Sequence, residues 1–114
     1  MSKKIYSLRI SCSSSEQKNK VSELLHLDPI SDINPDWCIE IEEREEYFDF
    51  INYFLDNVEG KYEELKTIGI DKEHISIWLL YEYDNQCNLE FLPKDLKRIG
   101  ENDIALCVSC WSSR

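Results

Sequence analysis

Cysteines are the residues of this chain with the most distinctive chemistry, and two of them, Cys107 and Cys110, have the C-x-x-C spacing of dithiol and zinc sites. A redox pair of this kind works at a helix N-terminus, where the helix dipole lowers the pKa of a thiol. The surrounding residues 104–111, IALCVSCW, instead have the composition of a strand. Residues three apart on a strand point to opposite faces, so we expect neither a disulfide nor a zinc site between these two cysteines.

The total of five cysteines is odd, with Cys12, Cys38 and Cys87 as the others. The opening residues 1–12, MSKKIYSLRISC, alternate between polar and apolar and lack the continuous apolar core of an export signal. No apolar run approaches the ~20 residues that a membrane-spanning helix needs. We therefore expect a cytoplasmic protein in which all five thiols are unpaired and pack as small apolar side chains.

The remaining candidates for catalysis occur singly. His26 is expected at the end of a helix and His74 at the start of a strand, and neither has a serine, cysteine or second histidine at a catalytic or metal-binding spacing. The three glycines, Gly60, Gly69 and Gly100, are isolated and form no phosphate-binding loop. The sequence therefore predicts a protein that is not an enzyme, with no catalytic, cofactor-binding or metal site.

Carboxylates are concentrated in one quarter of the chain. Residues 36–64 contain eleven acids against Arg44 and Lys61, a balance of −9 within a net charge of −10. The electrostatic field of so much negative charge repels nucleic acid and anionic membranes, and it accelerates the encounter with cationic proteins. No two of these carboxylates stand out as an acid–base pair. A basic protein partner is therefore the interaction that the charge distribution favours.

One aromatic residue is embedded in this acidic segment. At 100° per residue, Asp49, Tyr53 and Asp56 lie within about 60° of one another on a helix, opposite its apolar stripe. An aromatic ring among polar neighbours is a typical interface anchor, although a solvated helix face explains the same pattern. The residues predicted to bind the partner are Glu40, Glu42, Glu43, Glu45, Glu46, Asp49, Tyr53 and Asp56.

The elements that must position these residues follow from hydrophobic periodicity. Tyr47, Ile51, Phe54 and Val58 share one helical face, whereas residues 74–83 are apolar on both faces, as in a central strand. The strands are expected at 3–12, 37–42, 74–83 and a buried 104–111, with an optional one at 89–91. The helices are expected after Ser13 to about His26, from about 47 to 68 with an interruption at Gly60, and at 93–100. This order, β-α-β-α-β-(β)-α-β, predicts one α+β domain over residues 1–114. Its architecture would be a two-layer sandwich, with about three helices on a mixed sheet of four to five strands.

The whole chain resembles a family of small uncharacterised bacterial α+β domains. The resemblance rests on the opening strand IYSLRISC, a Pro-containing loop before Trp37, and the segment LPKDLKRIG followed by an apolar strand. It implies the fold and no catalytic residue.

In size, acidity and lack of a catalytic motif the chain is also similar to immunity proteins of contact-dependent growth-inhibition systems. These proteins bind a toxin domain, frequently a basic nuclease, and block its active site. The similarity implies an immunity protein that neutralises the basic C-terminal toxin domain of a secreted effector, with carboxylates in place of substrate phosphates. A small cytosolic regulatory or adaptor domain with another protein partner, or an enzyme of unrecognised type, is the alternative.

Overall fold

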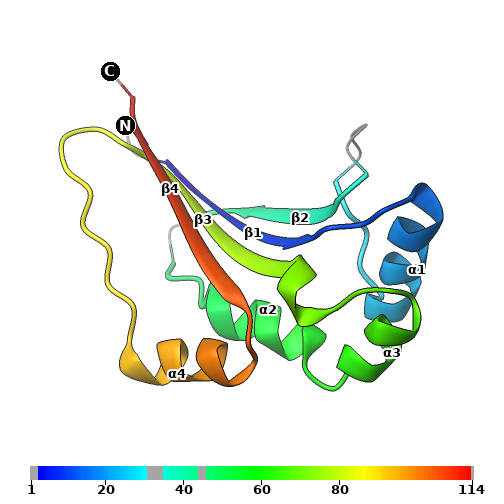
Figure 1. Ribbon diagram of the computed structural model, residues 1–114. Coiled ribbons are helices and arrows are strands. Elements are labelled where there is room, and N and C mark those ends of the chain that lie inside the picture. The colour runs from blue at the N-terminus through cyan, green and yellow to red at the C-terminus, as the bar shows by residue number, and fades with distance from the viewer. Residues whose placement is uncertain (1–2, 31–34, 44–45, 114) are drawn as a thin grey trace.

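The protein forms two layers, with the helices covering one face of a four-stranded sheet (Figure 1). The computed structural model describes residues 3–30, 35–43 and 46–113. In this part of the chain the strands are β1 (Lys3–Ile10), β2 (Trp37–Glu42), β3 (Ile75–Tyr83) and β4 (Ala105–Ser112). The helices are α1 (Ser15–Leu25), α2 (Phe50–Val58), α3 (Tyr62–Thr67) and α4 (Pro93–Glu101), with a 3₁₀ turn at Lys72–His74. The predicted two-layer α+β fold is confirmed.

The strand order across the sheet is β2-β1-β3-β4. β1 is antiparallel to both of its neighbours, whereas β3 and β4 are parallel. A parallel pair needs a long crossover, and residues 84–104, which contain α4, provide it. The register places Leu8 opposite both Ile39 and Ile77, so the apolar residues of three strands point to the same face. That face of the sheet forms one side of the hydrophobic core.

The helices pack their apolar sides against this face of the sheet. α2 contributes Phe50, Ile51, Phe54, Leu55 and Val58, all buried. Full burial of one such side chain contributes about 1.5–3 kcal/mol, so this short helix is held by packing and not by its intrinsic propensity. Within the described residues no helix combines the length and the apolar character that crossing a membrane requires.

The interruption expected at Gly60 is confirmed, since residues 47–68 contain two helices, α2 and α3, and the described residues contain four α-helices in all. α2 begins at Phe50 because Asp49 is its N-cap, with a side-chain oxygen that accepts from the Asn52 backbone N–H at 3.4 Å. The expectation that Tyr47 lies on the buried stripe is wrong, since its side chain is 81% exposed. Gly60, with φ of +80°, separates α2 from α3.

Three further expectations need correction. The last strand is not buried, because β4 pairs only with β3 and is an edge of the sheet. Residues 89–91 form no strand. The first helix is capped by Ser14, whose hydroxyl accepts from the Gln17 backbone N–H at 3.1 Å, and not by Ser13. Ser13 instead donates its backbone N–H to the Gln17 side chain at 2.7 Å.

Candidate functional site

The acidic residues that sequence reasoning grouped into one surface are divided among three parts of the molecule. Glu40 and Glu42 lie on β2 with their side chains on the sheet face that carries no helix, because they alternate with Ile39 and Ile41. Glu42 forms an ion pair with Lys3 at 3.1 Å. These two residues therefore cannot act on one partner surface together with the outer side of α2.

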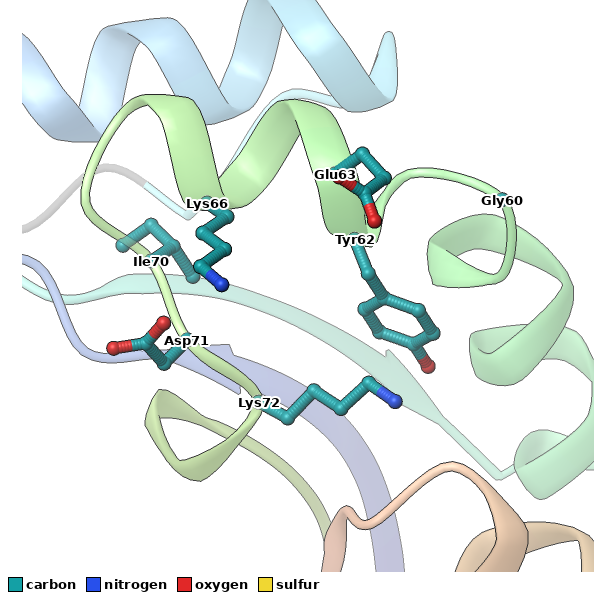
Figure 2. A pocket seen from close by; sticks show the side chains of 7 residues that line it. All are labelled: Gly60, Tyr62, Glu63, Lys66, Ile70, Asp71 and Lys72. Carbon is teal, nitrogen blue, oxygen red and sulfur yellow. The ribbon is translucent and has the colours of Figure 1, made fainter.

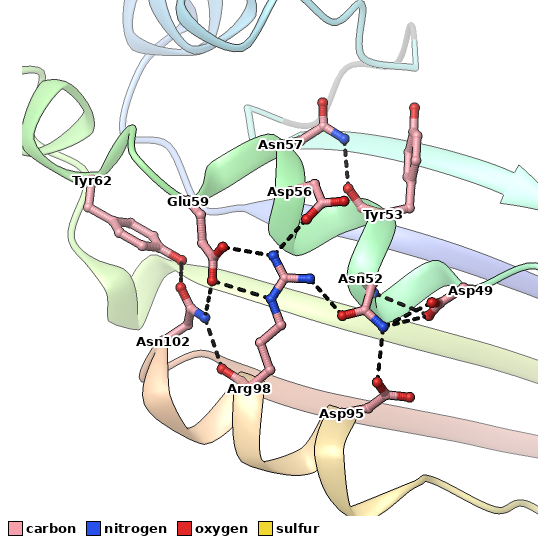
Figure 3. Close-up of polar contacts among 10 residues, drawn as sticks. All are labelled: Asp49, Asn52, Tyr53, Asp56, Asn57, Glu59, Tyr62, Asp95, Arg98 and Asn102. Atoms are coloured by element: carbon pink, nitrogen blue, oxygen red, sulfur yellow. Dashed lines mark hydrogen bonds and ion pairs between the residues drawn. The ribbon is translucent and has the colours of Figure 1, made fainter.

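The second group lies where α2 meets α4 (Figure 3). Asp49 caps α2, and Asp56 accepts from the Arg98 guanidinium at 2.6 Å. Tyr53 is 39% exposed, and its ring packs against Phe48 with centroids 5.4 Å apart. Arg98 of α4 is thus a basic residue at this face. Asp56 already forms an ion pair with Arg98 within the protein, so part of its charge is compensated before any partner binds.

The third group forms a cleft, and this is the strongest candidate site. The cleft has a volume of about 450 Å³, within the ~300–1,000 Å³ range of ligand sites. Its polar lining comes from separate segments of the chain and consists of Lys4, Tyr6, Glu43, Glu46, Tyr47, Asn88, Glu90 and Asp95. Glu45, which was also predicted to bind, lies outside the described residues. Among the residues that line the cleft, four carboxylates thus face one amine.

The buried side chain of Tyr6 forms part of the cleft lining. Its ring stacks on Phe50 with centroids 4.6 Å apart, and its hydroxyl donates to a Glu43 carboxylate oxygen at 3.4 Å. Burial and, next, the negative charge of Glu43 raise the pKa of Tyr6 to about 12. The phenol therefore stays protonated at neutral pH and remains a donor. Lys4 Nζ lies 3.5 Å from Glu43 Oε2, the same oxygen that accepts from Tyr6.

The opposite wall comes from residues 88–92 and the first turn of α4. Asp95 is buried, and one of its oxygens accepts from the Asn52 side-chain amide at 2.9 Å. Glu90 is exposed, and Phe91 is half-buried against the core. Tyr47 presents its exposed ring at the same cleft. This wall thus combines apolar side chains with one exposed carboxylate, Glu90, and one buried carboxylate, Asp95.

Sequence reasoning identified only Glu43 and Glu46 of this cleft. It placed Tyr47 in the core because the residue has helical spacing to Ile51, and no signal singled out Lys4 or Asp95. These residues are far apart along the chain, and only the packing of α2 and α4 on the sheet brings them together. The one available signal was Asp49, a strong N-cap residue, which could have moved the helix start beyond Tyr47.

A second cavity, of about 520 Å³, lies between α3 and the 3₁₀ turn (Figure 2). Its charged lining is balanced, with Glu63 and Asp71 against Lys66 and Lys72. Lys72 Nζ lies 4.6 Å from the centroid of the Tyr62 ring, a cation–π contact that supports the wall of the cavity. Among the described lining residues there is no nucleophile with a general base, so we assign no chemistry to this cavity.

The two histidines have local roles. His26 is the C-cap of α1, with φ of +57°, and His74 Nδ1 accepts from the Asp71 backbone N–H at 3.0 Å. Within residues 3–30, 35–43 and 46–113, no three His, Cys, Asp or Glu side chains are grouped so that they could hold a metal ion.

No protein-family model, curated protein sequence or solved structure matches the chain.

Proposed function

We propose that this chain is a binding protein of the immunity type, whose cleft receives a lysine or arginine side chain of a basic toxin domain and keeps that domain from its substrate. The observation that supports this proposal is the composition of the cleft, in which an exposed Tyr47 ring stands beside four carboxylates and one amine. A small α+β domain with this surface has the properties of an inhibitor that binds cationic protein.

An arginine is the side chain that such a cleft suits best. Its planar guanidinium can donate two parallel hydrogen bonds to one carboxylate, and its face can stack on an aromatic ring. Glu46 and Glu90 offer the carboxylates, and Tyr47 offers the ring. Lys4 does not compete for them, because its amine lies within ion-pair distance of Glu43. Buried aromatic and arginine contacts are also those that dominate binding energy at protein interfaces.

The long-range field supports the same partner. A net charge of −10, almost all of it from residues 36–64, attracts a basic protein before contact and raises the association rate at low salt. Nuclease domains have basic active sites because their substrate is a polyanion. Carboxylates of the cleft would occupy the positions of substrate phosphates, and the toxin would lose access to nucleic acid.

The decisive test is protection in cells. The basic C-terminal domain of a large secreted protein encoded beside this gene would be expressed in a bacterial host with and without this chain. We expect the chain to restore growth, and the double substitution Glu46→Lys with Glu90→Lys to abolish that protection. In binding kinetics with the purified toxin domain, the same variant should associate more slowly and with weaker salt dependence.

Two control variants give the test its specificity. Glu23→Lys with Glu64→Lys makes the same change in net charge at exposed positions outside the cleft, and it should still protect. Tyr47→Ala should mainly accelerate dissociation, by about tenfold or more if the ring is a buried hot spot. If the cleft variant and the charge control lost protection equally, the effect would come from net charge and not from the cleft. If the cleft variant still protected fully, the cleft would be excluded as the binding site.

A further inference from the structure

Two cysteines that are far apart in the sequence meet at the surface. Cys87 lies in the irregular segment of residues 84–92 between β3 and α4, and Cys110 lies on the edge strand β4. Their sulfur atoms are 3.4 Å apart, and both residues are free thiols. Cys110 is exposed and Cys87 is half-buried. The sequence analysis considered only Cys107 as a partner of Cys110, whereas the structure places Cys87 beside Cys110.

The local geometry favours a covalent bond between these thiols. A disulfide requires a sulfur–sulfur distance of about 2.05 Å, so the two atoms must approach by roughly 1.3 Å. Cys110 is fixed by the sheet, where it pairs with Tyr81 of β3. Cys87 belongs to a segment without helix or strand, and its backbone can follow the sulfur. The two sulfur atoms already lie within hydrogen-bonding distance of each other.

We propose that Cys87 and Cys110 are a reversible disulfide site that reacts with low-molecular-weight disulfides. In the first step a thiolate of the pair attacks one sulfur of the small disulfide, forms a mixed disulfide and releases one small thiolate. In the second step the other cysteine loses its proton to solvent and attacks the protein sulfur of the mixed disulfide, which releases the second small thiolate. Two protein thiols are oxidised to one disulfide, one small disulfide is reduced to two thiols, and the two protons end on the released thiolates.

The hydrogen bond with Cys87 and, next, partial burial raise the pKa of the Cys110 thiol. Cys110 is the exposed thiol of the pair and Cys87 the half-buried one, so the small disulfide reaches the Cys110 sulfur more readily. Replacement of either cysteine should leave a mixed disulfide on the other that no second thiol resolves.

The bond has a structural consequence for the cleft. Residues 88–92, directly after Cys87, line one side of it, and oxidation would tie this wall to β4. The effect on partner binding rests on the proposed function, whereas formation of the bond does not. A cell that becomes oxidised would thereby change the mobility of one wall of the cleft.

The test uses the full chain, purified anaerobically and then exposed to glutathione disulfide under native conditions. Free thiols counted after denaturation should fall from five to three, and a peptide map should place the bond between Cys87 and Cys110. Dithiothreitol should restore five. The Cys110→Ser variant should instead carry one stable glutathione adduct on Cys87. The matched control Cys107→Ser, changed on the same strand, should still lose two thiols.

Several results would overturn the proposal. These are a count that stays at five, a bond that involves Cys12, Cys38 or Cys107, or glutathione adducts retained on both Cys87 and Cys110. Amide hydrogen exchange gives a second measurement that needs no partner, since exchange in residues 84–92 should slow on oxidation of the wild-type chain and stay unchanged in Cys110→Ser. Disulfide formation together with unaltered toxin binding would uphold the site and contradict only its link to the cleft.

Discussion

Arg98 is the residue whose replacement best tests how α4 is held on α2. Its guanidinium donates to Asp56 at 2.6 Å, to Glu59 at 2.7 Å and to the side-chain oxygen of Asn52 at 2.6 Å (Figure 3). The Arg98 side chain is only 26% exposed, whereas those of Asp56 and Glu59 are 69% and 41% exposed. Solvent therefore screens the carboxylates more than the guanidinium.

The expected cost of Arg98→Ala follows from these contacts. Surface ion pairs contribute ~0.2–1 kcal/mol each, and two such pairs are lost. The part-buried hydrogen bond to Asn52 adds about 1 kcal/mol. We expect the free energy of unfolding to fall by about 2 kcal/mol at pH 7. Equilibrium urea denaturation measures this difference, with an unchanged dependence on urea concentration if the fold is intact.

Part of this contribution should disappear in acid. Hydrogen bonds from Arg98 and, next, Asn102 lower the pKa of Glu59 in the folded protein. A carboxylate with a lowered folded pKa stabilises the protein above its unfolded pKa of about 4.3, and this stabilisation is lost as the pH falls through the folded value. The difference between wild type and Arg98→Ala should therefore narrow by several tenths of a kcal/mol at about pH 3.

Lys97→Ala is the matched control. Lys97 is the preceding residue of α4, its side chain is 78% exposed, and its ion pair with Glu101 at 3.8 Å spans one helical turn. Such a pair contributes about 0.3–0.5 kcal/mol, so this variant should differ little from wild type. If Arg98→Ala cost no more than Lys97→Ala, or if its cost did not change between neutral and acidic pH, the assigned role of Arg98 would be wrong.

Two further predictions concern stability and use thermal and urea unfolding. Gly69→Ala should cost about 1–2 kcal/mol, because Gly69 has φ of +89° and an added Cβ would lie 2.8 Å from Gln17 Nε2. The matched variant Gly100→Ala should raise the free energy of unfolding by about 0.5–1 kcal/mol, because nothing lies within 4 Å of the added Cβ in α4. Equal changes in the free energy of unfolding for the two glycine variants would contradict this prediction. Trp37→Ala should cost about 3–5 kcal/mol, since the ring is fully buried and its N–H donates to Ser22 at 3.0 Å. A loss below about 1 kcal/mol would refute its place in the core.

The amino-acid sequence by itself determined most of the elements and the fold class. Alternation from Tyr6 to Ile10 and the apolar stripe from Ile51 to Val58 are local patterns, and each corresponds to an observed strand or helix. Local pattern failed at the start of α2, where stronger local chemistry was misread. Asp49 starts α2 after Tyr47, whereas the interruption expected at Gly60 is observed.

Only the tertiary structure decided which residues share a surface. Neighbours such as Glu42 and Glu43 are separated by the sheet, since adjacent strand-end residues point to opposite sides, and only Glu43 reaches the cleft. Arg98 meets Asp56, and Cys87 meets Cys110, across 42 and 23 residues of chain. Such contacts depend on strand order and on how helices pack against the sheet, which arise from burial of the whole apolar surface at once. Hydrophobic periodicity predicts which face of a helix or strand is buried. It does not predict which residues the other face will contact.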